Sequence, residues 1–164
     1  MCIRDSPFSQ FKYCPKCGSV HFEINNEKSK RCADCEFVYY FNPSAATVAL
    51  IMNERNELLV CRRAKDPAKG TLDLPGGFID MAETGEEGVS REVKEETGLT
   101  LTSYQFRGLI TFISDEAPEP EEMCLFTADG FTGELIECNE GDLQWMDKKE
   151  VLALPRWFWY PETS

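Results

Sequence analysis

Hydrophobic residues occur in short runs, separated by polar turns, through most of the chain after residue 45. Two runs, 47–52 and 58–63, predict β-strands, and the polar turn at 54–56 predicts that they pair as a hairpin. Further short apolar runs predict strands at residues 72–74, 109–113, 123–127 and 143–146. The Pro-Gly-Gly sequence at 75–77 is expected to end the first of these.

The strongest helix signal lies at residues 84–97. Thr84 and Glu87 have the spacing of a capping box, acidic residues follow in the first turn, and Gly98 stands where a helix ends. A second, shorter helix is expected over residues 148–154. Strands mixed with helices in this way predict the α/β fold class.

The segment before residue 42 has a different pattern, because it is short, polar and interrupted by cysteines. Proline disfavours helix in the residue before it, so Asn42 and Pro43 mark the boundary between two domains. We expect a ribbon at 11–41 and the main domain at 42–164. Residues 1–10 are expected to be a tail outside the fold, because MCIRDS at its start resembles a translated sequencing adaptor.

Composition narrows the range of partners. The formal charge is −12, with 29 acidic and 17 basic residues, so a nucleic-acid polymer is not expected as the primary partner. No apolar run reaches the ~20 residues that span a bilayer, and no signal peptide is seen, so we expect a cytoplasmic protein without a membrane partner.

Four of the eight cysteines form two closely spaced pairs that predict a zinc site. Cys14 and Cys17 form one pair, and Cys32 and Cys35 form the other. Four thiolates fill a tetrahedral Zn²⁺ site, so the expected metal is structural and compensates for a small core. The lone His21 is expected to face solvent, and the other cysteines after residue 35 are expected to be small strand or core residues.

Three glutamates share one face of the long predicted helix. Glu92, Glu95 and Glu96 stand at i, i+3 and i+4, where like charges repel one another. A hard divalent cation removes this repulsion, and oxygen ligands favour Mg²⁺ or Mn²⁺. From the residues alone, the alternative of an ordinary acidic surface stays open.

Residues 77–99, GFIDMAETGEEGVSREVKEETGL, resemble the Nudix hydrolase family at every fixed position of its motif. The matching residues are Gly77, Glu83, Arg91, Glu92, Val93, Glu95, Glu96, Gly98 and Leu99. The resemblance implies an α/β/α sandwich with a mixed sheet, and metal-dependent attack of water on phosphorus. It also implies that the Gly76 carbonyl joins the magnesium ligands and that Arg91 and Glu83 form a structural ion pair.

Which residue serves as general base is left open by the resemblance. Glu92 is one candidate. The others lie in the acidic segment 115–122: Glu116, Glu119, Glu121 and Glu122. For the substrate, Arg63 is the favoured phosphate contact among Arg62, Arg63 and Lys65, with Gly77 beside it. The segment 115–122, together with Phe112 and Phe126, is where base recognition is expected.

The second half of the chain resembles MutT-type 8-oxo-dGTP diphosphatases and lacks the signature of NADH pyrophosphatases, SQPWPFPxS. This resemblance predicts hydrolysis of a nucleoside triphosphate such as 8-oxo-dGTP to monophosphate and pyrophosphate. An NADH or ADP-ribose pyrophosphatase is the alternative enzyme, and a non-catalytic nucleotide sensor is the alternative of another class. A homodimer is an open expectation. The C-terminus is expected to be truncated, because MutT-type relatives continue into a closing helix.

Overall fold

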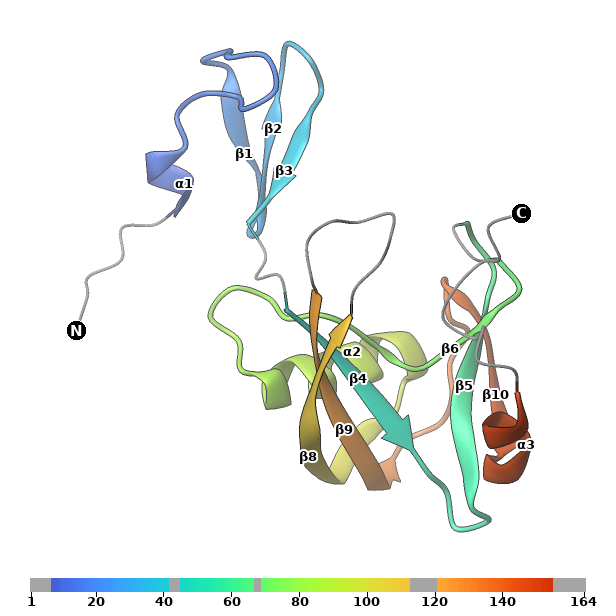
Figure 1. Cartoon of the computed structure of the whole chain (residues 1–164). Coiled ribbons are helices and arrows are strands. Elements are labelled where there is room, and N and C mark those ends of the chain that lie inside the picture. The colour runs from blue at the N-terminus through green and yellow to red at the C-terminus, as the bar shows by residue number, and fades with distance from the viewer. Residues whose placement is uncertain (1–6, 42–44, 67–68, 113–120, 155–164) are drawn as a thin grey trace, which may run out of the picture. The chain divides into compact units, whose positions relative to one another are not determined.

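The computed structural model describes residues 7–41, 45–66, 69–112 and 121–154 (Figure 1). Contacts divide the chain into two compact units. The N-terminal unit is Met1–Pro43 with Asp80–Ala82, and the C-terminal unit is Ser44–Ile79 with Glu83–Ser164. Within the described ranges, no helix has both the length and the apolar character needed to cross a membrane.

The N-terminal unit is a three-stranded antiparallel sheet. Its strands β1 (Phe22–Asn26), β2 (Ser29–Cys32) and β3 (Val38–Tyr40) lie in that order. A single helical turn, α1 (Pro7–Gln10), precedes them, and the ring of Phe8 packs on Phe41 with 4.8 Å between centroids. Packed residues of this unit therefore begin before residue 11, where the ribbon was expected to start.

Two sheets form the framework of the C-terminal unit. A four-stranded sheet has the order β7-β4-β9-β8, formed by Gly76–Phe78, Ala45–Ile51, Glu121–Thr132 and Thr100–Phe112. A three-stranded sheet has the order β10-β5-β6, formed by Gly141–Asp147, Glu57–Arg63 and Leu72–Asp73. Strands β4 and β9 are parallel and the other pairs are antiparallel, which confirms the predicted mixed sheet.

The predicted hairpin between the first two strands of this unit is wrong. Strand β4 pairs with β7 and β9, whereas β5 pairs with β10 and β6. Only an isolated bridge between Met52 and Leu58 remains of the expected pairing, although Asn56 does adopt the positive φ of a turn, 63°. Both strands read as apolar runs because each is covered on both sides, and such runs do not identify their partners.

The strand predicted at 72–74 is β6, and it ends before Pro75 as expected, but Gly76 and Gly77 then begin another short strand, β7, which pairs with β4. The two long strands β8 and β9 also extend beyond the predicted runs, because they include polar and exposed residues that carry no apolar signal. The last predicted strand is found as β10, one or two residues longer at each end.

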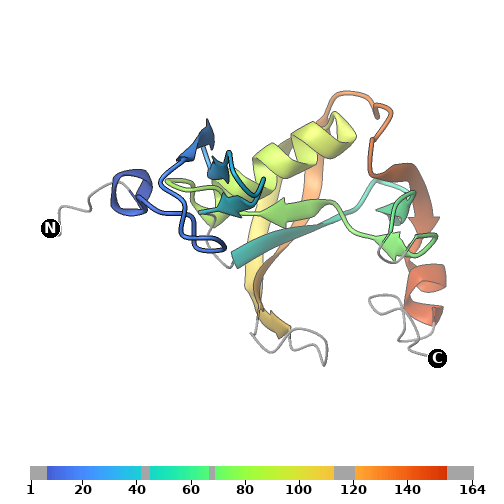
Figure 2. The same cartoon turned by 90° about the horizontal axis from the view of Figure 1, so that it is seen from above.

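The long helix α2 (Gly85–Thr97) forms as predicted and lies along the four-stranded sheet (Figure 2). Thr84 accepts a hydrogen bond from the Glu87 N–H, the Glu87 side chain accepts from the Thr84 N–H, and Gly98 ends the helix with φ of 79°. Val89 and Val93 are fully buried against the sheet. Burying each such side chain stabilises the fold by roughly 1.5–3 kcal/mol. This burial fixes one face of the helix on the sheet, and the charged residues lie on the opposite face.

The short helix α3 (Lys148–Ala153) follows β10 directly. Its N-cap is Asp147, whose carboxylate accepts a hydrogen bond from the Lys149 N–H at 2.7 Å. Val151 and Leu154 pack against the apolar cluster around β5. The predicted second helix is therefore present, while the expectation of a truncated end concerns residues 155–164, outside the described residues.

Candidate functional site

The acidic face of α2 meets the Gly76–Gly77 segment. The Glu96 carboxylate accepts a hydrogen bond from the Gly76 N–H at 3.0 Å. Glu92 accepts from the Arg91 guanidinium at 2.7 Å, and Glu95 receives a longer contact of 3.4 Å from the same group. Glu96 and Glu92 are largely sheltered from solvent, whereas the Glu95 side chain is 63% exposed.

Both glycines are required by close approach. A Cβ at Gly76 would lie 2.1 Å from the carbonyl oxygen of Thr47, and a Cβ at Gly77 would lie 2.7 Å from the Glu92 carboxylate carbon. Any side chain at position 76 would therefore clash with backbone, and one at position 77 would displace the carboxylate. The segment lets the β7 backbone reach the carboxylates of α2.

Arg91 ties the loop before α2 to the helix. Its guanidinium makes a two-point ion pair with Glu83, at 2.8 and 2.9 Å, and donates to the Phe78 carbonyl at 3.0 Å. The hydrogen bonds that Arg91 donates to Glu83 raise the Arg91 pKa more than burial lowers it, so this residue stays charged. The expected ion pair between Arg91 and Glu83 is present in the structure.

The Glu96 carboxyl is the most perturbed acid of the site. Burial raises its pKa to about 8, with smaller upward contributions from Glu92, Glu140 and Asp73 and an opposing one from the Gly76 N–H. Burial and neighbouring acids together disfavour a bare carboxylate here. A divalent cation relieves both effects, which fits the donor set of this face.

Mg²⁺ is the ion that these oxygen donors fit. It keeps several of its waters and takes only one or two carboxylates directly, so the ligands need not converge closely. The carboxylates of Glu92, Glu95 and Glu96 do not converge closely in the structure. In the described ranges, only the four cysteines form a group of three or more candidate ligands lying mutually within 4.8 Å.

A small cavity of about 80 Å³ lies beside Glu96, between α2 and the three-stranded sheet. Arg63, the expected phosphate contact, lines it, with its guanidinium 2.8 Å from the Asp73 carboxylate. Arg62 instead donates to the Gly70 carbonyl at 3.0 Å. Any substrate phosphate reaching Arg63 would therefore share it with Asp73.

The same cavity contains acids and thiols that sequence reasoning missed. Asp73 and Glu140 line it near Glu96, although they are 67 positions apart in the chain. The thiols of Cys61 and Cys138 also meet there, and burial raises the pKa of Cys61 to about 12. The position of Glu140 directly before the strand β10 was the only local signal.

The four cysteines of the two closely spaced pairs converge as predicted. Their sulfurs lie within 4.8 Å of one another, with 3.7 Å between Cys14 and Cys35 and 3.6 Å between Cys17 and Cys32. Four sulfurs at ~2.3 Å from a zinc ion would stand about 3.8 Å apart, so the cluster has the right size. The residues that directly follow the two pairs, Gly18 and Glu36, both adopt positive φ, of 75° and 59°.

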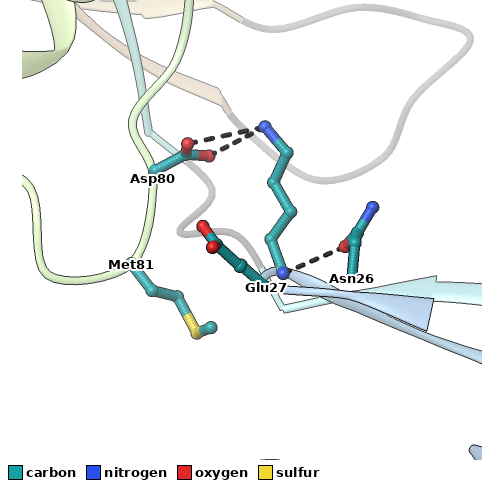
Figure 3. Close-up of a pocket in the computed structure, with 5 residues that line it drawn as sticks. Asn26, Glu27, Asp80 and Met81 are labelled. Atoms are coloured by element: carbon teal, nitrogen blue, oxygen red, sulfur yellow. Dashed lines mark hydrogen bonds and ion pairs between the residues drawn. The ribbon is translucent and has the colours of Figure 1, made fainter. Parts of the chain in front are cut away.

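Other polar features of the N-terminal unit contribute no comparable ligand set. His21 is exposed, as expected, with its Nδ1 3.2 Å from the Asp34 carboxylate. An open hollow of about 450 Å³ is lined by Asn26, Glu27, Lys28, Asp80 and Met81 (Figure 3). Its one cationic group, Lys28, lies 3.1 Å from the Asp80 carboxylate and is neutralised by it.

Comparison with known proteins places this geometry in a family. The family model described as NUDIX domain matches residues 42–163. The chain belongs to the Nudix hydrolase family. The sequence motif at 77–99 is thus a Nudix box, and the Glu92, Glu95 and Glu96 face is the part of the fold that carries it.

Related proteins differ in their substrates. The chain is 29% identical over 143 residues to NAD-capped RNA hydrolase NudC of Vibrio parahaemolyticus, covering 85% of this chain and 52% of that protein. It is 47% identical over 60 residues to an ADP-ribose pyrophosphatase of Methanocaldococcus jannaschii, 37% of this chain and 35% of that one. A MutT structure from Bacillus halodurans aligns with a TM-score of 0.59 and 29% identity, covering 68% and 72%.

Two further Nudix expectations meet the structure with mixed results. Glu121 and Glu122 lie in strand β9, where Glu122 accepts a hydrogen bond from Thr111 at 3.0 Å, rather than in a loop. Glu116 and Glu119 lie outside the described residues. Phe126 is 1% exposed and packs in the core against Tyr104 and Phe106, so the expectation that it contacts a substrate base is wrong.

Proposed function

We propose that this Nudix enzyme hydrolyses a phosphoanhydride bond of a nucleotide with Mg²⁺ or Mn²⁺ bound by Glu92, Glu95, Glu96 and the Gly76 carbonyl. One observation carries the proposal: the partly buried carboxylate of Glu96 is held against the Gly76 backbone on the same face as Glu92. When bound, the metal supplies charge neutralisation at phosphorus and a more acidic attacking water.

The protein groups have separable tasks in this proposal. Arg91 fixes the Glu92 carboxylate and anchors the loop through Glu83, so both are positioning residues. Gly77 leaves the space that Glu92 and a phosphate require. A carboxylate must also take a proton from the attacking water. Glu92 and Glu140 are our candidates for this base, because both lie near Glu96 and Asp73, the other acid there, is paired with Arg63.

The first candidate substrate is a nucleoside triphosphate, with 8-oxo-dGTP as its test case. The resemblance of the second half of the chain to MutT enzymes supports it, and so does the MutT structure of 29% identity. Hydrolysis would give the nucleoside monophosphate and pyrophosphate. Discrimination of an oxidised purine would come from buried polar groups left unpaired by the wrong base.

The second candidate is a dinucleotide diphosphate such as NADH or ADP-ribose, and the relatives favour it. The NudC alignment covers more of the chain than the Nudix match does, so it extends into the N-terminal unit. The chain spans about half the length of that relative. Because that relative is named for capped RNA, the charge argument against a nucleic-acid polymer does not extend to a capped RNA end.

A substrate panel decides between the two. We expect kcat/KM to be highest for 8-oxo-dGTP when 8-oxo-dGTP, dGTP, NADH and ADP-ribose are compared at one Mg²⁺ concentration with product identification. A roughly tenfold preference for NADH or ADP-ribose would replace the first candidate by the second. Binding of all four without turnover would favour the non-catalytic sensor instead.

We also propose that Cys14, Cys17, Cys32 and Cys35 hold one structural Zn²⁺. The fit of their sulfur spacing to a tetrahedral site supports this. Four protein ligands leave no open position for a substrate, so the metal would stabilise the small sheet around it. Zinc content of the purified chain, close to one ion per molecule, tests the assignment.

A further inference from the structure

Two thiols of the C-terminal unit meet beside Glu96. Cys61 lies in strand β5, and Cys138 lies in the segment 133–140, which joins β9 to β10 and contains no helix or strand. Both line the cavity of about 80 Å³ that Glu96 also lines, and their side chains hydrogen bond to each other. Each is a free thiol, and Cys61 is the more deeply buried of the two. The fold therefore brings together two nucleophiles that are far apart in the sequence.

Backbone contacts at the end of the segment 133–140 hold both sulfurs in place. The Glu140 N–H donates a hydrogen bond to the Cys138 Sγ at 3.4 Å, and the Glu140 carbonyl accepts one from the Ala64 N–H at 2.8 Å. Gly141 is the next residue, and a Cβ there would lie 2.9 Å from the Cys61 Sγ. Both sulfurs therefore lie where the segment begins to pair with β5.

The surroundings of this pair differ from those of thiols that only fill an apolar core. Buried thiols usually behave as small hydrophobic groups. This cavity is lined, besides the two thiols, by four charged side chains: Arg63, Asp73, Glu96 and Glu140. A volume of about 80 Å³ among polar groups admits water and molecules of similar size, such as hydrogen peroxide. A small oxidant can therefore reach the thiols.

A disulfide between the two cysteines requires only a small movement. The sulfurs of a disulfide lie about 2.05 Å apart, closer than those of two thiols that share a hydrogen bond. Cys61 is fixed in place, because β5 pairs with β10 on one side and with β6 on the other. Cys138 belongs to a segment without strand pairing and has more freedom. The approach is therefore made by Cys138.

We propose that Cys61 and Cys138 form a reversible disulfide, and that its formation lowers hydrolysis at the neighbouring site. With hydrogen peroxide as oxidant, the less buried Cys138 sulfur attacks one peroxide oxygen, the O–O bond breaks, and a sulfenic acid and one water form. The Cys61 sulfur then attacks the Cys138 sulfur, the S–O bond breaks, and the hydroxyl group leaves with the Cys61 proton as a second water. A dithiol reverses the bond by exchange and becomes a disulfide itself.

The disulfide would act on Glu140, a candidate base of the proposed hydrolysis. When the Cys138 sulfur moves toward Cys61, the hydrogen bond from the Glu140 N–H is strained and the end of the segment moves with it. A displacement of about 1 Å can cost a hundredfold in rate, so we expect kcat to fall at least about tenfold. Only this loss of activity rests on the proposed function, and formation of the bond does not.

Peptide mapping of the oxidised full chain tests the bond directly. The purified protein, supplied with Zn²⁺, is treated with hydrogen peroxide and digested without a reductant. We expect a cross-linked pair of peptides that contain Cys61 and Cys138, and dithiothreitol should both remove the cross-link and restore kcat. Cys138→Ser keeps an acceptor for the Glu140 N–H, so it should be active before oxidation and stay active in peroxide. Cys124→Ser is the matched control and should behave like the parent, because Cys124 is also a free thiol but packs against the core cluster of α2.

Melting temperatures verify that the variants fold, and Cys61→Ala is the second variant that cannot form the bond. The proposal is overturned if the Cys61–Cys138 cross-link is absent after peroxide has consumed the thiols, or if Cys124 enters cross-links in comparable yield. It is also overturned if peroxide inhibits Cys138→Ser as strongly as the parent. A failure of the proposed function is distinguishable, because turnover would then be missing before any oxidation while the peptide map still decides on the bond.

Discussion

At the scale of single residues, the site depends on distances that only certain side chains allow. Glu96 is partly buried, accepts one backbone hydrogen bond and lies among other acids, so burial and its neighbours disfavour its charged form and a cation would favour it. A Cβ at Gly77 would lie closer to the Glu92 carboxylate than van der Waals contact allows, so the glycine leaves room for this carboxylate. A substitution at either position is therefore expected to lower activity while the protein stays folded.

Glu96→Gln should preserve the fold and lower kcat by at least about a hundredfold. The amide oxygen of glutamine can still accept the Gly76 N–H, but it adds no negative charge for the metal. Glu86→Gln, on the same helix but away from the cluster, should retain activity. Mg²⁺ should raise the melting temperature of the unmutated protein and much less that of Glu96→Gln. Near-normal turnover of Glu96→Gln would remove this residue from the ligand set.

Gly77→Ala should lose most activity while changing the melting temperature little. The new Cβ meets the end of a flexible side chain, which can rotate away, but the Glu92 carboxylate then leaves its position. Gly108→Ala is the matched control, because a Cβ there meets no atom within 4 Å. Kinetics at increasing Mg²⁺ measure the effect. Full activity of Gly77→Ala would show that Glu92 need not occupy this place.

At the scale of elements, α2 connects the core to the site. Its buried face, with Val89 and Val93, fixes the helix on the sheet, and its opposite face presents the glutamates. The capping box at its start and the left-handed Gly98 at its end fix where the helix begins and ends. The register of the glutamates against Gly76 therefore depends on the caps as well as on packing.

Thr84→Ala should lower the free energy of unfolding by roughly 1 kcal/mol, because the Glu87 N–H loses its acceptor. This corresponds to a melting temperature lower by a few degrees. Thr84→Ser keeps the hydroxyl and should restore most of the stability. Denaturant unfolding of the three proteins checks the prediction, and equal stability of Thr84→Ala and the parent would show that water replaces the cap.

At the scale of the whole molecule, the two proposed metal sites lie in two different units and differ in chemistry. The thiolates of the N-terminal unit are ligands that zinc prefers, and the carboxylates of the C-terminal unit are ligands that magnesium prefers. Each unit has its own buried cluster, around Cys14, Phe22 and Cys32 in the first and around α2 in the second. Loss of one metal should therefore leave the other site functional.

Cys32→Ser should release the zinc and unfold the N-terminal unit, because its small core does not suffice without the metal. Mg²⁺-dependent hydrolysis by the C-terminal unit should continue. Metal analysis and limited proteolysis measure the first effect, and kcat/KM measures the second. Activity that disappears while the C-terminal unit stays folded would mean that the N-terminal unit contributes to the substrate site.

Local signals were sufficient for several features. The capping residues of α2, the glutamates at i, i+3 and i+4, and the spacing of the cysteine pairs all act within a few residues, so the sequence alone determined them. The same holds for the ion pair of Arg91 with Glu83, which the family resemblance implied and the structure contains. These features depend on one helix or one turn, whose geometry is nearly fixed.

Strand partners and cavity residues depend on contacts between distant parts of the chain, and only the tertiary structure decided them. The apolar runs of β4 and β5 predicted a hairpin, yet the two strands pair with other strands in two different sheets. Asp73 and Glu140 reached Glu96 only because β6 and β10 flank the same strand, and Phe126 went into the core because its position on β9 faces α2. An apolar run specifies burial, but the choice of neighbour is made by the sum of all packed surfaces.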